Sequence, residues 1–499
     1  MLSQKYRHLF DNTHLHVDLK KRSLKSGAVT VSSQAIIFFI QLGSIMILAR
    51  ILTPEDYGIN AMAVAITGFA GIFTHLGLST ATVQREDITH EQVSTLFWIN
   101  AAIGILLTLI IASLSSVVGW FYKTSEMIWV MLALSATFTI TGLSVQHSAL
   151  LTRQMRFYSI AKIQVVAMLA GILVAIISGL YGFGYWALVF NTLTQVLATT
   201  AGLWLSCRWI PGLPSRHPGV LPMIKFGADL VGFNVINYFA RNLDNVLIGR
   251  FHGSGPLGLY SKAYQLLMMP ITKLRDPVTR VAMPALSTLQ NEPQNYRNYY
   301  IKLVSILAFV SMPLVAFLFA CSDQIIKVLL GSQWLGASSI FKALAIAAFI
   351  QPTSTTWGLV LLSTGQSRRY LKWGVVNSFV IIVFFIIGLQ WGAYGVAVFY
   401  TIATYLLLYP TLKYCFKNTP LNPLNYFYAI WKQFIGSVVM GFCCYSLVKA
   451  MKEINDILTL IICLIIGTIV YLTFFVLVAW SSNDLKEYYS YGRQIFSKS

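Results

Sequence analysis

Apolar stretches of about 20 residues, separated by short polar joints, follow one another along almost the whole 499-residue chain. A helix of that length just crosses a hydrocarbon core roughly 30 Å thick. Only 11% of the residues are charged, whereas a soluble protein has about 25%. The pattern therefore predicts an all-α polytopic membrane protein. It excludes a soluble enzyme with one anchor and an outer-membrane barrel, whose strands would alternate over about 10 residues.

The lengths and flanks of these stretches predict 14 transmembrane helices. They lie near residues 27–48, 58–78, 94–118, 128–151, 160–179, 183–206, 224–249, 258–286, 299–321, 338–364, 370–389, 392–415, 430–449 and 457–480. An even number places both termini on the same side of the membrane. The joints on that side carry 24 lysines and arginines and the other joints carry 6, so the positive-inside rule predicts cytoplasmic termini.

Short patterns recur along the chain in the same order, at offsets between 200 and 213 residues. The matching pairs are 48–50 with 248–250, 154–157 with 366–370, and 182–187 with 392–397. This spacing predicts two parallel repeats of six helices, followed by two more helices. The predicted parts are a basic cytoplasmic leader (1–26), an N-lobe (27–206), a cytoplasmic linker (207–223), a C-lobe (224–415), and a final part with two helices and a cytoplasmic tail (416–499).

Charged and polar residues inside predicted helices 7 and 8 form the candidate site. A charge costs about 2.5–3.5 kcal/mol at the centre of a transmembrane helix, so these residues are expected to face water or each other. The candidates for lining a cavity and binding substrate are Asn234, Asn237, Arg241, Lys273, Arg275 and Arg280. The candidates for ion coupling or charge pairing are Asp229, Asp244 and Asp276.

Two interpretations of these charges stay open at this point. In one, Arg241 pairs with Asp244, and Arg275 or Arg280 pairs with Asp276, so that the pairs only hold the lobe together. In the other, the bases line a cationic cavity that receives an anionic headgroup. The two helices contain five bases and three acids, which favours the cationic cavity.

Other polar and aromatic residues have simpler explanations. Lys342 is alone in predicted helix 10 and is either a coupling or substrate residue, or a residue whose amine reaches the interface from the nearby periplasmic end of the helix. Trp120, Trp129 and Trp209 lie near helix ends and are typical of the aromatic belt at a membrane interface.

No catalytic constellation emerges from the sequence. The motifs GxxxxGK[ST], HExxH and GxSxG are absent, and the six cysteines show no CxxC spacing. The chain is therefore expected to be no enzyme and to need no cofactor or metal. Its net charge of +19 comes mostly from bases in short joints between helices, which argues against a nucleic-acid partner.

Four segments resemble conserved joints of bacterial polysaccharide flippases in the multidrug/oligosaccharidyl-lipid/polysaccharide exporter superfamily. They are LARILTPEDYG at 48–58, GLSTATVQR at 77–85, LTRQMRF at 151–157, and NLDNVLIGR at 242–250 followed by LGLY at 257–260. They occur in the expected order, and the resemblance covers roughly residues 27 to 400. The combination is most similar to the colanic-acid and exopolysaccharide branch.

The resemblance implies 14 helices in two six-helix lobes. It also implies transfer of an undecaprenyl-diphosphate-linked oligosaccharide from the cytoplasmic to the periplasmic leaflet of the bacterial inner membrane, for exopolysaccharide, capsule or O-antigen assembly. Its partners would be this lipid-linked glycan, membrane lipids, and polymerase or export proteins, while coupling to H⁺ or Na⁺ is left open. The positions that match family motifs are Arg50, Arg85, Arg153, Asp244 and Arg250.

Two alternative functions remain. A cation-coupled multidrug antiporter of the same superfamily would need a net acidic lining. A membrane polymerase or ligase of lipid-linked glycans would need a long periplasmic loop with catalytic side chains, whereas the longest outer joint is at about 322–337.

Overall fold

The computed structural model describes residues 10, 19–75, 78–85, 88–215, 238, 242–451 and 453–479. Every regular element in these residues is a helix, as the sequence predicts. The chain divides into two compact units, residues 1–255 and 256–498. This boundary lies beyond the predicted linker, and the lobes delimited by that linker stay a prediction.

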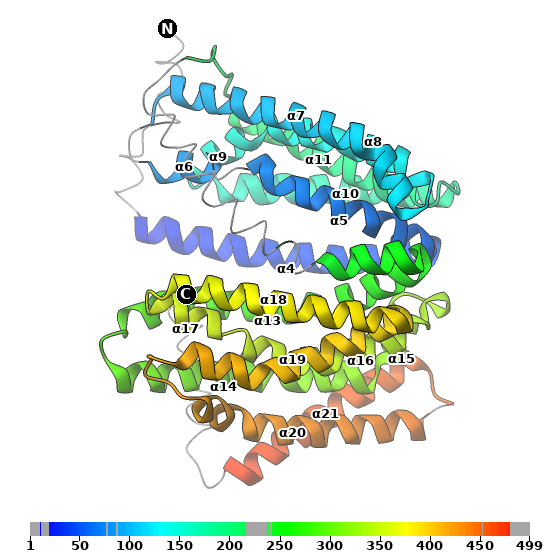
Figure 1. Cartoon of the computed structure of the whole chain (residues 1–499), viewed down its shortest axis with the longest axis vertical. Helices are drawn as coiled ribbons and strands as arrows, with labels where there is room; N and C mark the ends of the chain where they lie inside the picture. Colours follow the sequence, from blue (N-terminus) through cyan, green and yellow to red (C-terminus); the bar gives the residue numbers. More distant parts are fainter. Residues whose placement is uncertain are drawn as a thin grey trace. The chain divides into compact units, whose positions relative to one another are not determined.

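The first unit consists of membrane-length helices and short connecting helices (Figure 1). In chain order they are α4 (Leu19–Ile51), α5 (Pro54–His75), α6 (Leu78–Gln84), α7 (His90–Tyr122), α8 (Glu126–Gly142), α9 (Val145–Arg153), α10 (Phe157–Leu180) and α11 (Trp186–Cys207), with a further helical stretch at 242–252. Helix α7 packs against α8, and α10 packs against both α4 and α11. One apolar core of this unit contains Leu96, Phe97, Leu150 and Leu203.

Helix α7 begins earlier than the predicted helix at 94–118 because a capping box defines its start. The Thr89 hydroxyl accepts a hydrogen bond from the backbone N–H of Gln92 at 3.3 Å, and the Gln92 side chain accepts one from the backbone N–H of Thr89 at 3.0 Å. These bonds satisfy N–H groups that the first turn of a helix otherwise leaves without partners.

The second unit contains the remaining helices (Figure 1). They are α13 (Ser254–Thr288), α14 (Pro293–Ala320), α15 (Ser322–Leu329), η1 (Ser332–Trp334), α16 (Ala337–Ser354), α17 (Trp357–Ser363), α18 (Ser367–Gly388), η2 (Leu389–Trp391), α19 (Gly392–Phe416), α20 (Pro423–Ala450) and α21 (Asp456–Ala479). Helix α14 packs against α16 and α20, α19 packs against α16 and α18, and α20 packs against α21.

In the described part of the chain, ten helices are long and apolar enough to cross a membrane, or eleven if the bent pair α8 and α9 is one span. One of the ten is the 50-residue run Ser367–Phe416. A helix of that length would measure about 75 Å, so we count α18 and α19 as separate crossings. The total of 14 stays a prediction. Predicted helix 7 lies largely outside the described residues, and predicted helix 8, observed as a helix over Ser254–Thr288, is not among the ten.

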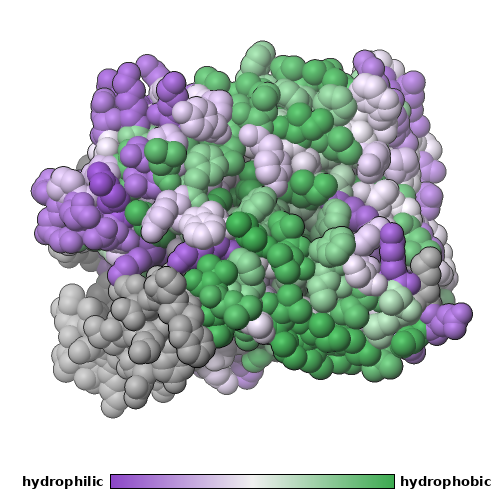
Figure 2. All heavy atoms as spheres, turned by 90° about the horizontal axis from the view of Figure 1, so that it is seen from below, coloured by the Kyte–Doolittle hydropathy of each residue, from purple (hydrophilic) through white to green (hydrophobic). Residues whose placement is uncertain are grey.

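The surface supports this assignment. Figure 2 shows the face on which α20 and α21 lie, where hydrophobic residues fill the middle and hydrophilic residues lie at both ends. Phe442 and Leu477 on these helices are 73% and 74% exposed. A broad apolar band of this kind is typical of a surface that contacts hydrocarbon. The protein is therefore a multi-pass membrane protein.

The two halves of the chain repeat the same local features. Predicted helix 4 is broken into α8 and α9, and predicted helix 10 is broken into α16 and α17; each was expected to be one helix. Helix α17 begins at Trp357, which is 212 residues after Val145, where α9 begins. Left-handed backbone also recurs, with a φ of 52° at Met155 and 72° at Gly365. The predicted internal repeat therefore has a counterpart in the backbone.

Arginines from the repeated motif cap helix ends in both halves. Arg156 donates to the carbonyl of Ser206 near the end of α11, at 3.2 Å. Arg369 donates to the carbonyl of Tyr414 near the end of α19, and its guanidinium lies 4.9 Å from the centre of the Tyr414 ring. A cation at the C-terminus of a helix satisfies free carbonyls and opposes the helix dipole. The motif therefore has a structural function in each half.

Close packing of α18 on α19 leads to the first prediction. A Cβ atom on Gly388 would lie 2.7 Å from the carbonyl oxygen of Gly395, and a Cβ atom on Gly395 would overlap the carbonyl oxygen of Gly388. We expect Gly395→Ala to destabilise the protein by about 1–3 kcal/mol, because two backbones must separate. Thermal unfolding of the purified protein in detergent measures this change.

The control for this experiment is Gly374→Ala, also in α18, where an added Cβ would meet nothing within 4 Å. This substitution should be neutral or stabilising by up to about 1 kcal/mol, because alanine is the better helix former. Equal unfolding temperatures for the two variants would contradict the packing argument.

Candidate functional site

Helix α13 carries the charged residues of predicted helix 8 and contains three prolines. Pro270, Pro277 and Pro284 lie inside it. A proline lacks the N–H that would bond to the carbonyl four residues earlier. Pro277 and Pro284 therefore remove the helical hydrogen bonds to the carbonyls of Lys273 and Arg280. These two residues combine a cationic side chain with a carbonyl that is freed from the helical ladder.

Lys273 and Arg280 lie on the same face of α13, because they are separated by seven residues, close to two helical turns. Both are exposed. The opposite face is buried in the second unit, through residues such as Ile271 and Ala282, which are 1% and 0% exposed. Arg280 takes part in no ion pair with any described residue. The packing of α13 therefore directs Lys273 and Arg280 away from the core of its own unit.

Arg275 lies elsewhere on the helix and is neutralised. Its Nη2 is 3.0 Å from Oδ1 of Asp276, and its Nε donates to the same oxygen at 3.2 Å. The two side chains are 24% and 49% exposed. For Arg275, the interpretation as a local charge pair thus holds. Even with this pair, α13 has four bases and one acid, a net charge of +3.

The fourth base of α13 is buried. Lys262 is 8% exposed and donates a hydrogen bond to Oε1 of Gln265 at 2.8 Å. It precedes Lys273 by eleven residues, about three turns, and so lies on the same side of the helix. The cationic face of α13, defined as Lys262, Lys273 and Arg280, thus runs along most of the helix.

The candidates in predicted helix 7 are mostly not placed. Asp229, Asn234, Asn237 and Arg241 lie outside the described residues, so their function stays a prediction. Asp244 is buried, at 6% exposure, and its Oδ1 accepts a hydrogen bond from the backbone N–H of Asn245 at 2.8 Å.

Arg153, one of the family-motif positions, is a buried structural residue with 4% exposure. Its guanidinium donates to the carbonyls of Thr82 at 3.2 Å and Phe10 at 3.3 Å, and also to the carbonyl of Arg85. These contacts join the end of α9 to the end of α6 and to the N-terminal segment. Arg153 therefore stabilises the packing of α9, α6 and the N-terminal segment against one another.

The other motif arginines lie at helix ends. Arg250 stacks between aromatic rings, with its guanidinium carbon 5.6 Å from the centre of Phe121 and 5.7 Å from that of Phe251. Arg50 is exposed near the end of α4, and Arg85 is half-buried just after α6. Each belongs to a connection between helices.

A buried polar cluster was missed by the sequence analysis. Trp209, expected in an interfacial belt, is 0% exposed, unlike Trp120 and Trp129 at 78% and 64%. Its indole N–H donates to Nδ1 of His90, and its carbonyl accepts from Nε2 of His147, both at 3.1 Å. The belt interpretation was wrong for Trp209 because proximity to a helix end does not reveal what packs over it.

The segment that follows Trp209 is bonded to α7. The indole of Trp98 donates to the carbonyl of Gly212 at 2.9 Å, and the backbone N–H of Gly212 donates to the Ser94 hydroxyl at 2.9 Å. The backbone N–H of Ser215 also donates to the Thr95 hydroxyl, at 3.1 Å. The start of the predicted linker is therefore attached to the first unit.

Comparison with known proteins identifies the family. A model of the polysaccharide biosynthesis protein family matches residues 47–339, more than half of the chain. The chain belongs to this family. It is 29% identical to the teichuronic acid biosynthesis protein TuaB of Bacillus subtilis (strain 168), over 85% of this chain and 89% of TuaB. It is 24% identical to the lipopolysaccharide biosynthesis protein WzxC of Escherichia coli (strain K12), over the same shares.

The fold has a close counterpart among solved structures. The lipid II flippase MurJ, in an inward closed conformation, superposes with a TM-score of 0.72 at 16% identity. The match covers 92% of this chain and 99% of MurJ. The predicted fold class, an all-α polytopic membrane protein, is thereby confirmed.

Proposed function

We propose that this member of the polysaccharide biosynthesis family transfers an undecaprenyl-diphosphate-linked oligosaccharide repeat unit across the bacterial inner membrane, with both termini in the cytoplasm. The observation that carries the proposal is the cationic face of α13, on which Lys273 and Arg280 are exposed and Lys262 is buried. The biosynthetic relatives and the MurJ-like fold support it.

The chemistry of such a substrate matches this face. A diphosphate with attached sugars cannot enter hydrocarbon without losing its hydration, while the polyprenyl tail is stable there. Arginine and lysine can replace water around the phosphate oxygens through charge-assisted hydrogen bonds. We propose that Lys273 and Arg280 bind the diphosphate, together with Arg241, Asn234 and Asn237 from predicted helix 7.

The proposed mechanism is alternating access. The headgroup enters from the cytoplasm, the two lobes rock about it, and the glycan leaves on the periplasmic side while the tail stays in lipid. Asp229, Asp244 and Asp276 are the proposed positions for a coupling cation, H⁺ or Na⁺. The pairing of Asp276 with Arg275 counts against Asp276 in this function. Removal of product by polymerisation would supply direction without any ion.

The alternatives fit less well. An antiporter of cationic compounds is disfavoured by the net charge of +3 on α13. A polymerase or ligase is disfavoured because the longest outer joint, between α14 and α16, contains only the short elements α15 and η1.

A deletion strain tests the proposal. We expect loss of the surface polymer and accumulation of a lipid-linked repeat unit on the cytoplasmic leaflet. In spheroplasts of the deletion strain, membrane-impermeant periodate should leave this glycan intact. In spheroplasts of the complemented strain, the same treatment should oxidise it. Mass spectrometry of the extracted lipid identifies the glycan. A repeat unit that is oxidised but unpolymerised would support the polymerase instead, and normal polymer with altered drug sensitivity would support the antiporter.

A further inference from the structure

A second site lies on the surface of the second unit, away from the charges of α13. It is an apolar groove of about 560 Å³ between α14, α16, α19 and α20, within the range of roughly 300–1,000 Å³ for sites that hold small molecules. Its walls carry exposed apolar side chains, including Ile346 at 44%, Val438 at 50% and Phe442 at 73%. Between helices that lie in hydrocarbon, such a groove is open to lipid chains.

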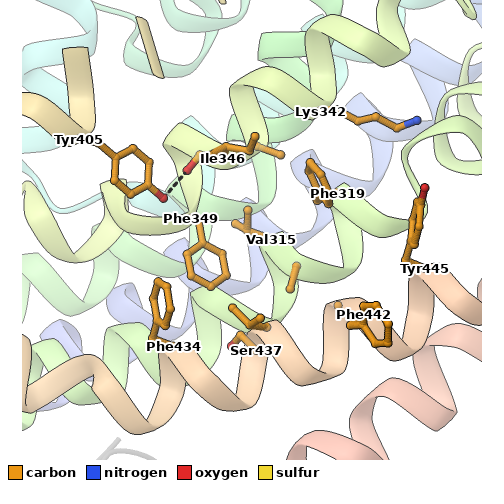
Figure 3. A pocket seen from close by; sticks show the side chains of 14 residues that line it. Val315, Phe319, Lys342, Ile346, Phe349, Tyr405, Phe434, Ser437, Phe442 and Tyr445 are labelled. Carbon is orange, nitrogen blue, oxygen red and sulfur yellow. Dashed lines mark hydrogen bonds between the residues drawn. The ribbon is translucent and has the colours of Figure 1, made fainter. Parts of the chain in front are cut away.

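The groove has an apolar end and a polar end (Figure 3). Phe349, Phe434 and Tyr405 close the apolar end, where the Tyr405 hydroxyl is already bonded to the carbonyl of Ile346 at 2.9 Å. On α20 the lining residues run from Phe434 to Tyr445. Eleven residues of helix rise about 16 Å, roughly half of a 30 Å hydrocarbon core. The groove is therefore as deep as one leaflet.

The polar end carries a small net positive charge. Lys342 Nζ lies 2.8 Å from Oδ2 of Asp323. Burial by itself would raise the pKa of Asp323, but hydrogen bonds from Lys342 and Ser338 and the charge of Lys342 lower it below its usual value, so the carboxylate is ionised at neutral pH. Tyr445 also lines this end of the groove, and the Nζ of Lys449 lies 4.7 Å from the centre of its ring. Two lysines and one aspartate leave one positive charge at the mouth.

From this geometry we infer that the groove holds one acyl chain of a membrane phospholipid, whose phosphate lies at the mouth between Lys342 and Lys449. The depth of one leaflet matches a phospholipid chain rather than a polyprenyl tail, which is long enough to need the whole membrane. The single net positive charge matches one phosphate. The lipid would fill the space between α20 and the pair α14 and α16. The inference does not depend on the proposed function.

Replacing groove residues by tryptophan tests the inference on the full-length protein. We expect one phospholipid per chain to remain bound to wild-type protein through detergent washing, as counted by native mass spectrometry. Val438→Trp, in the wall formed by α20, should reduce the bound fraction at least ten-fold by filling the groove. Ile346→Trp, in the wall formed by α16, should do the same independently of α20.

The matched control is Val439→Trp. Val439 is the neighbour of Val438 in α20 and is 43% exposed, but it does not line the groove. This variant should retain the lipid as wild type does, and unchanged elution in size-exclusion chromatography shows that each variant is folded. Lys449→Gln should weaken retention of the phospholipid. Equal retention by all the tryptophan variants, loss from Val439→Trp as well, or a bound mass that belongs to a polyprenyl lipid would overturn the inference.

Discussion

The double variant Lys273→Gln/Arg280→Gln should export at least about a hundred-fold less polymer than wild type while reaching the membrane in normal amounts. A hydrogen bond to a charged group contributes about 1.5–3 kcal/mol, and each 1.4 kcal/mol is a factor of about ten. Losing both cations therefore removes at least about 3 kcal/mol of headgroup binding. Surface polymer, normalised to the membrane content of the protein, measures the effect.

The control for this variant removes the same charge elsewhere. Arg368→Gln/Lys372→Gln replaces an arginine and a lysine that are exposed at the start of α18. It should leave export within about two-fold of wild type, because interactions of exposed charges contribute only about 0–1 kcal/mol. Normal export by the α13 variant, or equal loss in both, would mean that the cationic face does not bind the headgroup.

The second large effect is expected at Arg153. Replacing it by methionine keeps a long apolar stem but leaves the carbonyls of Thr82, Arg85 and Phe10 without their donor. The hydrogen bond to Thr82 is buried and those to Arg85 and Phe10 are partly buried. A buried carbonyl without a donor costs about 1–3 kcal/mol, so we expect destabilisation of about 2–3 kcal/mol. The measurements are the midpoint of thermal unfolding in detergent and the yield of folded protein.

Arg156→Met is the matched comparison for that variant. Arg156 lies three residues further along and is exposed, and among the described residues its guanidinium donates one hydrogen bond, to the carbonyl of Ser206. Water can replace this bond, so the loss should be about 1 kcal/mol or less. If Arg153→Met were as stable as Arg156→Met, the structural function assigned to the buried guanidinium would be wrong.

The positions of most helices could be predicted from the sequence. The predicted helix at 392–415 is observed as α19, Gly392–Phe416, and the one at 160–179 is observed as α10, Phe157–Leu180. The breaks inside predicted helices 4 and 10 were missed, since both sides of each break are apolar and the hydropathy does not change there. At the break in predicted helix 10, the hydroxyl of Thr356 forms a buried hydrogen bond of 2.9 Å with the hydroxyl of Tyr300.

The candidate site was predictable in part. The charges of α13 were found because a charge in an apolar stretch is conspicuous. The groove beside α20 was not, because its lining is apolar like every other lipid-facing surface and comes from four helices. The sequence analysis likewise left the partner of Lys342 unknown, because Asp323 lies 19 residues away in another helix.

By itself, the sequence determined that this protein crosses the membrane many times as helices, and it predicted that the two halves are related. A helix satisfies its backbone hydrogen bonds within its own segment, so crossing a membrane is a local property that can be read from one stretch at a time. Only the tertiary structure decided which charges are neutralised, as for Arg275 with Asp276, and which residues are buried, as for Arg153 and Trp209. Burial depends on segments that meet from distant parts of the chain, such as Arg153 and Thr82, 71 residues apart.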